Sequence, residues 1–340
     1  MQSVYNLTLE ELINYFLNIN EKSYRANQLF EWLYKKGINN FTEITNMSKK
    51  IINQLNRDFY LDNMTIIKEE HDNDVSKYLF QLSDDNYIES VLMNHNYGNS
   101  LCISTQVGCS MGCLFCESGR LKKKRNLETS ELILQVLKVQ NMIKKRISHV
   151  VVMGIGEPFD NYINLCKFIE IINHPKGIAI GARHITISTC GITPKIKEFM
   201  KLPYQINLAI SLHAPNDKLR NQIMPINKRY SITDLINVIK EYIEKTNRRI
   251  TFEYILLRDI NDRKEHAIEL SKLLQGINCY VNLIPYNETN NNQYKRSKKD
   301  TIKEFYDILK KNNIIVTIRM EFGSNISAAC GQLRSKKEEA

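Results

Sequence analysis

The sequence lacks the features that direct a chain into or across a membrane. None of its apolar runs approaches the roughly 20 residues that a membrane-spanning helix needs. Its first residues, MQSVYNLTLEELINYF, carry acids where a secretory signal would carry bases. Internal repeats are also missing. We therefore expect a soluble, cytoplasmic protein that has no membrane partner, and we expect a monomer.

Acidic side chains are too few to balance the basic ones. The 47 Lys and Arg residues exceed the 37 Asp and Glu residues, which gives a net charge of +10. A basic excess favours a polyanionic partner such as RNA. A chain of 340 residues, 43% of them hydrophobic, has enough material for two domains of unequal size.

Residues 1–75 are predicted to form a small N-terminal helical domain. A helix is expected to begin after Thr8, and apolar residues at three- and four-residue spacing predict two more over 25–34 and 47–59. This basic module is interpreted as an RNA-binding accessory domain, although a simple packing appendage has the same composition. Residues 76–98 alternate in polarity on both sides of residues 84–86, which predicts a β-hairpin that links the two domains.

From residue 99 to residue 333 the pattern alternates between strand and helix. Such alternation predicts parallel strands joined by right-handed crossovers, here an α/β fold built as a partial (β/α)6 TIM-like barrel. A barrel places its chemistry at the carboxyl ends of its strands. Residues 334–340 form a basic, polar tail. The expected strands are 101–105, 149–153, 184–188, 206–211, 250–256, 280–284 and 314–318, and the clearest helices are 130–146, 231–245, 263–275 and 300–312.

Three of the eight cysteines crowd into eight residues directly after the first expected barrel strand. Cys109, Cys113 and Cys116 form a C-x3-C-x2-C run, with Gly108 and Gly112 available for tight turns. Thiolates ligate iron–sulfur clusters, usually four to a [4Fe–4S] cluster. Three cysteines leave one iron open, and this spacing resembles the signature of radical S-adenosylmethionine (SAM) enzymes, in which the open iron binds SAM.

Two other interpretations of the cysteine run stay open at the level of sequence. A structural zinc ion needs four closed ligands, and Cys102 is the nearest candidate for the fourth. Buried cysteines without a ligand role are the second alternative. Cys166, Cys190 and Cys279 match no motif and are expected to be structural.

A second motif follows the next buried strand. Residues 154–158 read Gly-Ile-Gly-Glu-Pro, and this turn resembles the one that meets the methionine amino group of SAM in radical SAM enzymes. Alone, the pattern also fits an ordinary glycine loop with an exposed carboxylate at Glu157.

Several distinctive segments together resemble the RlmN/Cfr family of radical SAM RNA methyltransferases, and the RlmN branch most closely. The resemblance extends from about residue 20 to residue 333. The segments are Arg25–Leu29, Trp32–Tyr34, Ser211–Asn216, Met224–Asn227, Asn282–Asn287 and Ala328–Leu333, the last of which reads AACGQL.

The resemblance implies a methyl transfer that uses one [4Fe–4S] cluster and two SAM molecules per turnover. The first SAM methylates a cysteine that matches Cys330, and the second is cleaved at the cluster to a 5′-deoxyadenosyl radical. That radical activates the S-methyl group, which adds to the adenine ring. A cysteine that matches Cys102 then releases the product as a Cys102–Cys330 disulfide. Glu89 matches the residue that accepts the last proton, with Cys102 as a rival for that role.

The resemblance also implies which residues contact SAM. Hydroxyl and amide groups suit its ribose and carboxylate, and backbone groups suit its adenine edge. His213 is equally compatible with a core histidine. The implied contacts are Gly156, Glu157, Ser188, Ser211, Leu212, His213 and Asn287.

The substrate implied for the RlmN branch is an adenosine of the peptidyl-transferase centre in 23S rRNA, methylated at C2, together with the adenosine 3′ of the anticodon in tRNAs. A flavodoxin or ferredoxin is the expected electron donor. The Cfr branch methylates C8 instead, which confers antibiotic resistance. Glu157-Pro158 and His213-Ala214 favour C2, whereas Gly119 and Phe322-Gly323 favour C8.

Some positions depart from the family pattern and weaken the substrate assignment. Glu117, the basic run Lys122–Arg125 and Cys190 stand where other residue types are usual. A function of another class, a non-catalytic RNA-binding protein stabilised by a metal, also fits the cysteine run and the basic charge.

Overall fold

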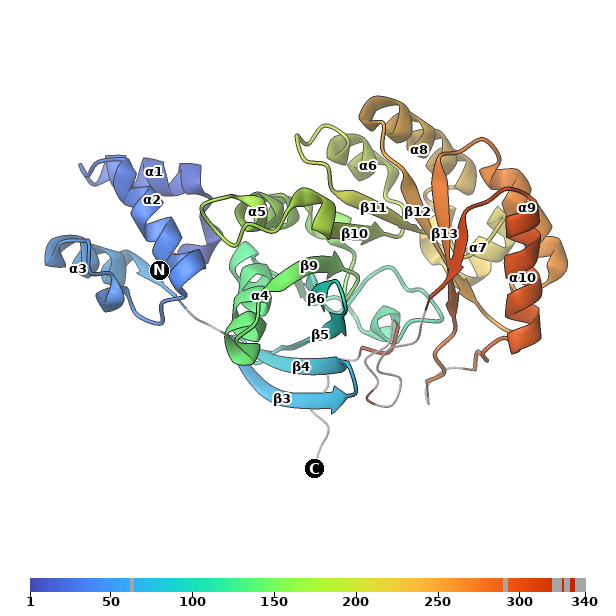
Figure 1. Ribbon diagram of the computed structural model, residues 1–340, viewed down its shortest axis with the longest axis horizontal. Helices are drawn as coiled ribbons and strands as arrows, with labels where there is room; N and C mark the ends of the chain where they lie inside the picture. Colours follow the sequence, from blue (N-terminus) through green and yellow to red (C-terminus); the bar gives the residue numbers. More distant parts are fainter. Residues whose placement is uncertain (62–63, 290–292, 320–325, 327–330, 334–340) are drawn as a thin grey trace.

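The structure is a computed structural model that describes residues 1–61, 64–289, 293–319, 326 and 331–333 (Figure 1). Within these residues, no helix is both long enough and apolar enough to cross a membrane. A ten-stranded sheet runs through the molecule in the order β14-β13-β12-β11-β10-β9-β6-β5-β4-β3.

Seven strands of this sheet are parallel and follow one another in chain order. Each strand pairs with the next one, and six crossovers connect the seven strands along the chain. The strands thus form the incomplete barrel that the sequence predicted. Their apolar side chains pack with those of the surrounding helices in one large core. The strands are β6 (Gly98–Cys102), β9 (Ile147–Val152), β10 (Ile185–Thr189), β11 (Asn207–Ser211), β12 (Ile250–Leu256), β13 (Cys279–Pro285) and β14 (Val316–Ile318).

Helices fill the crossovers between these strands. Figure 1 shows α4 and α5 beside β6 and β9, and α8, α9 and α10 outside the later strands. The longer helices bury an apolar stripe, as Leu235, Ile239 and Tyr242 of α8 illustrate. The helices are α4 (Thr129–Ile143), α5 (Tyr162–Asn173), α6 (Thr193–Phe199), α7 (Asp217–Ile223), α8 (Ile232–Thr246), α9 (Lys264–Leu274) and α10 (Lys299–Lys311).

The predicted hairpin is present and is built into the main sheet. Strands β4 (Val75–Leu82) and β5 (Tyr87–His95) pair in antiparallel register around Asp85, and β5 continues onto β6. Strand β3 (Met64–Asp72) was not expected, because we assigned this stretch to the helical domain. It is an edge strand whose charged residues stay partly solvated, so it lacks the apolar alternation that marks a half-buried strand.

The N-terminal module contains the three predicted helices, α1 (Leu9–Asn18), α2 (Tyr24–Glu31) and α3 (Lys49–Asp58). Thr8 caps α1 in a capping box with Glu11, as its position suggested. Strand β1 (Gln2–Ser3) pairs with β2 (Phe59–Tyr60) and closes the module on itself. The module is tied to the barrel, because the backbone N–H of Ser130 in α4 donates to Asn6 Oδ1 over 2.8 Å.

Candidate active site

The loop that carries the three clustered cysteines is closed at its base by a short antiparallel pair. Strands β7 (Gln106–Val107) and β8 (Arg125–Asn126) bracket it. Within the loop, the Cys109 N–H donates to the Leu121 carbonyl over 3.0 Å. Gly108 and Gly112 have φ angles of 74° and 67°, so the expected turns use glycine where other residues would be strained.

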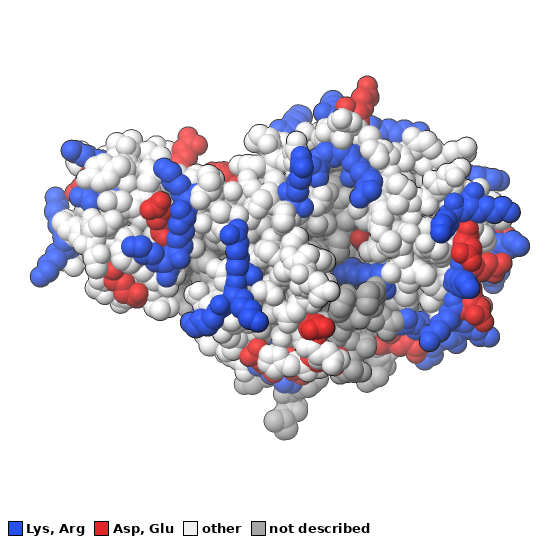
Figure 2. Space-filling model, viewed as in Figure 1, with Lys and Arg blue, Asp and Glu red and all other residues white. Residues whose placement is uncertain are grey.

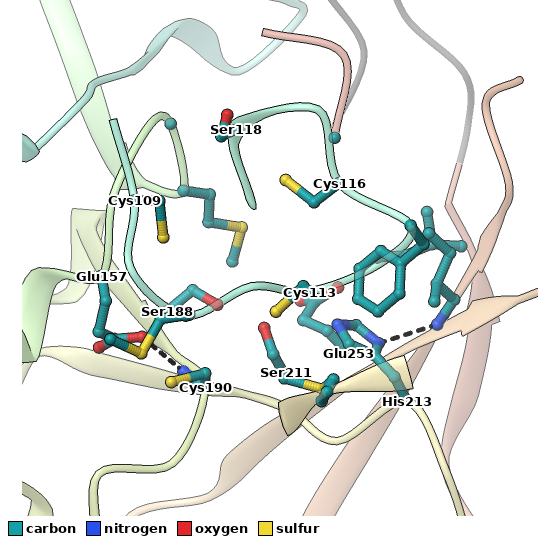
Figure 3. Close-up of a pocket in the computed structure, with 18 of the residues that line it drawn as sticks. Cys109, Cys113, Cys116, Ser118, Glu157, Ser188, Cys190, Ser211, His213 and Glu253 are labelled. Atoms are coloured by element: carbon teal, nitrogen blue, oxygen red, sulfur yellow. Dashed lines mark hydrogen bonds between the residues drawn. The ribbon is translucent and has the colours of Figure 1, made fainter. Parts of the chain in front are cut away.

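The three cysteines line one cavity of about 150 Å³ at the carboxyl ends of the barrel strands, and Figure 3 shows their side chains around it. Burial raises the pKa of the Cys109 thiol to about 12. Burial also raises the pKa of Cys113 well above its usual value, and the neighbouring thiols of Cys116 and Cys109 raise it further. The three thiols therefore share one electrostatic environment.

The donor set suits a cluster better than a single metal ion. In the described part of the chain, no three or more His, Cys, Asp or Glu side chains lie close enough together to hold one ion. A zinc site needs such a closed set. A four-iron cluster is larger and takes one thiolate at each iron, so three thiols spaced around a cavity fit it.

A buried arginine beneath the cavity supports the same conclusion. Arg220 is 0% exposed, and no described carboxylate lies within salt-bridge distance of it. An uncompensated buried charge is costly, but a cluster on three thiolates carries net negative charge and would offset it. Arg220 already lowers the pKa of the nearby Cys113 thiol. It donates hydrogen bonds to the carbonyls of Cys190 (2.7 Å), Ser211 (3.0 Å) and Leu212 (3.0 Å) and to Asn227 Oδ1 (2.8 Å).

The Glu157 carboxylate ties the glycine-rich turn to the end of β10. It accepts hydrogen bonds from the Cys190 N–H (2.7 Å), the Thr189 hydroxyl (2.7 Å) and the Phe159 N–H (3.0 Å), and the first of these is drawn in Figure 3. Burial raises the pKa of Glu157, while these donors lower it. Glu157 is buried and lines the cavity, which excludes the alternative of an exposed loop carboxylate.

His213 lines the cavity as a neutral imidazole. Burial lowers its pKa to about 3, with a further contribution from Arg220. Its Nδ1 accepts the Ile255 N–H over 3.0 Å, and its ring meets Phe115 edge-on at 5.0 Å. The histidine is thus satisfied by the protein on one nitrogen and still faces the cavity beside Ser211 (Figure 3).

The remaining candidate SAM contacts divide into two groups. Gly156, Ser188 and Ser211 line the cavity. Leu212 and Asn287 are buried and are not among its lining residues.

Sequence reasoning missed several residues of the cavity wall. Glu253, in the middle of β12, is buried there, and burial raises its pKa while Arg319 and Asn282 lower it. A glutamate inside the apolar stretch ITFEYIL was the available signal. Met153, Cys190 and Arg319 also line the cavity, although we had taken Cys190 as purely structural.

Cys102 and Glu89 lie on a neighbouring part of the sheet and do not line this cavity. Cys102 ends β6 opposite Val91 of β5, and Glu89 lies two residues before Val91, so the side chains share one face of the sheet. Glu89 is 5% exposed, and one of its carboxylate oxygens is 3.5 Å from Lys77 Nζ. Alternation along a hairpin strand could also have placed Glu89 in solvent, but the side chain is buried.

Cys330 lies outside the described residues, but the chain directly after it is placed. Gly331 lines the cavity, and its carbonyl accepts the Glu117 N–H over 2.8 Å. The Ser118 hydroxyl donates to the Leu333 carbonyl over 3.0 Å, and Leu333 packs in one apolar cluster with Cys102. The segment after Cys330 thus connects the cysteine loop with the surroundings of Cys102.

No disulfide joins two of the described cysteines, and the expected Cys102–Cys330 bond involves a residue outside them. Of the cysteines assigned structural roles, Cys166 and Cys279 are half-buried and buried, and neither lines the cavity.

The unusual basic run has a local explanation. Lys123 Nζ lies 2.7 Å from Asp160, and Arg125 pairs with Asp84 at 2.6 Å and with Glu131 at 2.7 Å. These ion pairs hold the base of the cysteine loop.

Comparisons with known proteins find relatives along the whole chain. Residues 103–271 match the model of the radical SAM superfamily, and residues 3–61 match that of the ribosomal RNA large subunit methyltransferase N-terminal domain. The chain is 53% identical to a "Probable dual-specificity RNA methyltransferase RlmN" of Enterococcus faecalis, over 99% of this chain and 97% of that protein. A protein of the same description from Spiroplasma citri is 52% identical, with 99% of each chain covered. The crystal structure of a radical SAM methyltransferase from Sphaerobacter thermophilus superposes with a TM-score of 0.94 at 38% identity, covering 99% of this chain and 100% of that one.

Proposed function

Because the chain belongs to the RlmN family of radical SAM RNA methyltransferases, we propose that it methylates C2 of an adenosine in the peptidyl-transferase centre of 23S rRNA. We extend the proposal to the adenosine 3′ of the anticodon in tRNAs. The observation that carries it is the placement of three thiols on one buried cavity, beside the segment that follows Cys330.

Cys109, Cys113 and Cys116 would hold one [4Fe–4S] cluster, with SAM bound beside it. When bound, these groups supply the methyl group and the radical chemistry. Ser188 and Ser211 offer hydroxyls at the ends of β10 and β11. The buried and neutral His213 adds no charge that would compete with the SAM sulfonium. We expect a flavodoxin or ferredoxin as the electron donor and a monomeric, cytoplasmic enzyme.

Three further residues have proposed roles in transfer. Cys330 carries the methyl group, and Cys102 forms the disulfide that releases the methylated base. Glu89 accepts the last proton. The position of Glu89 supports this role, because it is buried on the face of the sheet that also carries Cys102.

One of the two features that suggested methylation at C8 has a structural explanation in the cysteine loop. Gly119, which suggested C8 chemistry, packs so tightly that a Cβ there would lie 2.6 Å from the Cys113 carbonyl oxygen. Its identity therefore reflects packing against the cluster loop and carries little information on the substrate. Phe322-Gly323 lies outside the described residues.

The experiment compares Cys102→Ala with Cys330→Ala in anaerobically prepared, cluster-loaded enzyme. Loss of Cys330 should stop turnover before any adduct forms, whereas loss of Cys102 should trap protein covalently joined to RNA. A denaturing gel with and without RNase detects the adduct, and mass spectrometry of the rRNA reports the methylated carbon. Cys279→Ala, at a buried cysteine away from the cavity, is the matched control and should turn over normally.

A non-catalytic RNA-binding protein predicts no adduct in either variant. Normal turnover by Cys102→Ala would show that Cys102 is not the resolving residue. 8-Methyladenosine in the product would assign the chain to C8 chemistry.

A further inference from the structure

A second cavity opens at the other end of the barrel strands. It measures about 800 Å³ and is lined by the amino-terminal parts of β10, β11 and β12 and by the loops before them. Arg183 reaches it from the short helix Ala182–His184, and Arg248 and Arg249 reach it from the loop between α8 and β12. In Figure 2, basic side chains curve around a hollow in the upper middle of the molecule, where Figure 1 shows β11 and β12.

Neutral groups hold these three guanidinium groups in place. Arg183 donates two hydrogen bonds to Gln205 Oε1, at 2.9 and 3.1 Å, and Arg248 donates one to Asn207 Oδ1 at 2.7 Å. Arg249 stacks over the ring of Tyr280 at 5.1 Å. Within the described residues, no carboxylate lies within 4 Å of any of the three. The positive charge around the cavity is therefore positioned but not neutralised.

One carboxylate residue lines the cavity. The acid of the cavity, Glu253, lies at its inner end, where Asn282 Nδ2 donates to it over 2.9 Å.

We propose that this cavity binds phosphate groups of the RNA backbone. Guanidinium groups present planar forks that match phosphate oxygens, and three of them converge here with no competing anion at the rim. The hydroxyls and amides of Thr186, Thr251 and Asn278 add neutral contacts.

A polymer fits better than a free nucleotide, because the positive charge continues along the surface. Arg146 donates to the Ala179 carbonyl over 2.8 Å, and a neighbouring cavity of about 510 Å³ is lined by Lys144, Lys145 and Arg146. The segment 177–184 contributes to both cavities, so the two basic sites flank one stretch of chain.

The basic cavity lies at the opposite end of the strands from the three cysteines, so it would bind a part of the RNA that is distant from the reacting adenosine. Contacts to phosphates fix position without reading sequence. The inference rests on the proposed function in one respect, the choice of RNA as the source of phosphate.

The test measures RNA affinity rather than methylation. We would compare wild-type holoenzyme with the double variant Arg183→Gln/Arg249→Gln, using a labelled RNA stem–loop with an unpaired adenosine in anaerobic filter binding over a range of salt. Both side chains are exposed, so the variant is expected to fold. The matched control, Lys272→Gln/Lys311→Gln, removes the same charge from exposed positions on α9 and α10.

We expect the arginine variant to bind RNA at least tenfold more weakly than the control. Its log Kd should also depend less on log salt, by about 0.7 to 0.9 for each lost phosphate contact. The charge-keeping variant Arg183→Lys/Arg249→Lys should recover most of the affinity. Equal affinities and salt slopes for the arginine variant and the control would overturn the proposal.

A parallel arm uses inorganic pyrophosphate as the probe and thermal stability as the readout. Pyrophosphate could raise the thermal stability of the wild type but not of the arginine variant, while the two proteins bind RNA equally well. That result would assign the cavity to small phosphate compounds and would overturn the proposal that it binds RNA. Wild-type protein that binds no RNA would instead contradict the proposed function itself. The two failures are therefore distinguishable.

Discussion

Arg220 and Arg183 lie at opposite ends of the same parallel strands, and each is held by a side-chain amide. At the carboxyl end, Arg220 is fully buried and uses Asn227 together with three backbone carbonyls. At the amino end, Arg183 is exposed and bonds Gln205. The arginine at one end is therefore enclosed by protein, and the arginine at the other end is open to water.

The difference shows how one sheet separates two tasks. Charges in a dry cavity interact strongly and must be matched by the groups around them. Charges on solvent-exposed side chains are screened, contribute little to the free energy of folding and remain available to a ligand. Substitutions at the carboxyl end should therefore impair both stability and chemistry, and those at the amino end should mainly affect binding.

The largest effect is expected for Cys113→Ala. It removes one of the three thiols on the cavity, and we expect loss of the cluster and of SAM cleavage. Iron analysis after anaerobic reconstitution and quantification of 5′-deoxyadenosine would check this. Cys166→Ala, on the outer helix α5, should keep both. Stoichiometric iron in Cys113→Ala protein would contradict the ligand assignment.

The next effect concerns the buried arginine. Arg220→Met leaves three carbonyls at the ends of β10 and β11 without their donor, and we expect unfolding to become easier by at least about 3 kcal/mol. Removing a positive charge beside the cluster should also make it harder to reduce. Arg220→Lys keeps the charge but cannot reach all four acceptors.

Urea denaturation and the reduced fraction at fixed dithionite separate the two roles of Arg220. The lysine variant should lose stability while it keeps more reduced cluster than the methionine variant. Identical reduction of both variants would show that the charge of Arg220 does not act on the cluster.

A smaller, pH-dependent effect is expected at His213. Because burial lowers its folded-state pKa to about 3, the unfolded chain binds the proton more readily between that value and 6.5. The neutral, buried His213 therefore contributes to the free energy of unfolding at neutral pH. That contribution is lost as pH falls below 6.5, by about 2 kcal/mol at pH 5.

His213→Asn should reduce that loss. Asparagine tolerates the φ of 59° at this position and can accept the Ile255 N–H. Urea titrations of cluster-free protein at pH 7 and pH 5 would measure the difference. An equal acid loss in both proteins would show that other groups cause it.

The sequence predicted the barrel because apolar strand segments alternate with helical segments along the chain. β12 begins and ends at the residues that we expected, and the other parallel strands differ mainly at their ends. The edge strand β3 was missed because pairing on one side leaves its side chains partly solvated. A strand of this kind has little periodicity to detect.

Site residues were predictable where a motif fixed the local chain. The cysteine run and the Gly-Ile-Gly-Glu-Pro turn lie on the cavity as expected. Arg220, Glu253 and Arg319 were not identified, because their importance comes from strands and loops that meet only in the folded chain. A buried charge is recognised by what surrounds it, and that information is absent from a local pattern.

The smallest effect should come from the amide that holds Arg183. Gln205→Ala removes two hydrogen bonds at an exposed site, so we expect the free energy of unfolding to change by no more than about 0.5 kcal/mol. The matched change at the other end, Asn227→Ala, removes a buried amide that accepts from Arg220 and donates to Asp217 and Asn221. That variant should lose about 2 kcal/mol or more, because it leaves a buried guanidinium N–H without an acceptor. Urea denaturation of the two variants side by side compares the ends of the barrel directly.

RNA affinity should respond in the opposite order, with a modest loss for Gln205→Ala because Arg183 is no longer oriented toward the cavity. Equal destabilisation by the two changes would mean that the amino end is as tightly built as the carboxyl end, and that its arginines serve folding rather than RNA.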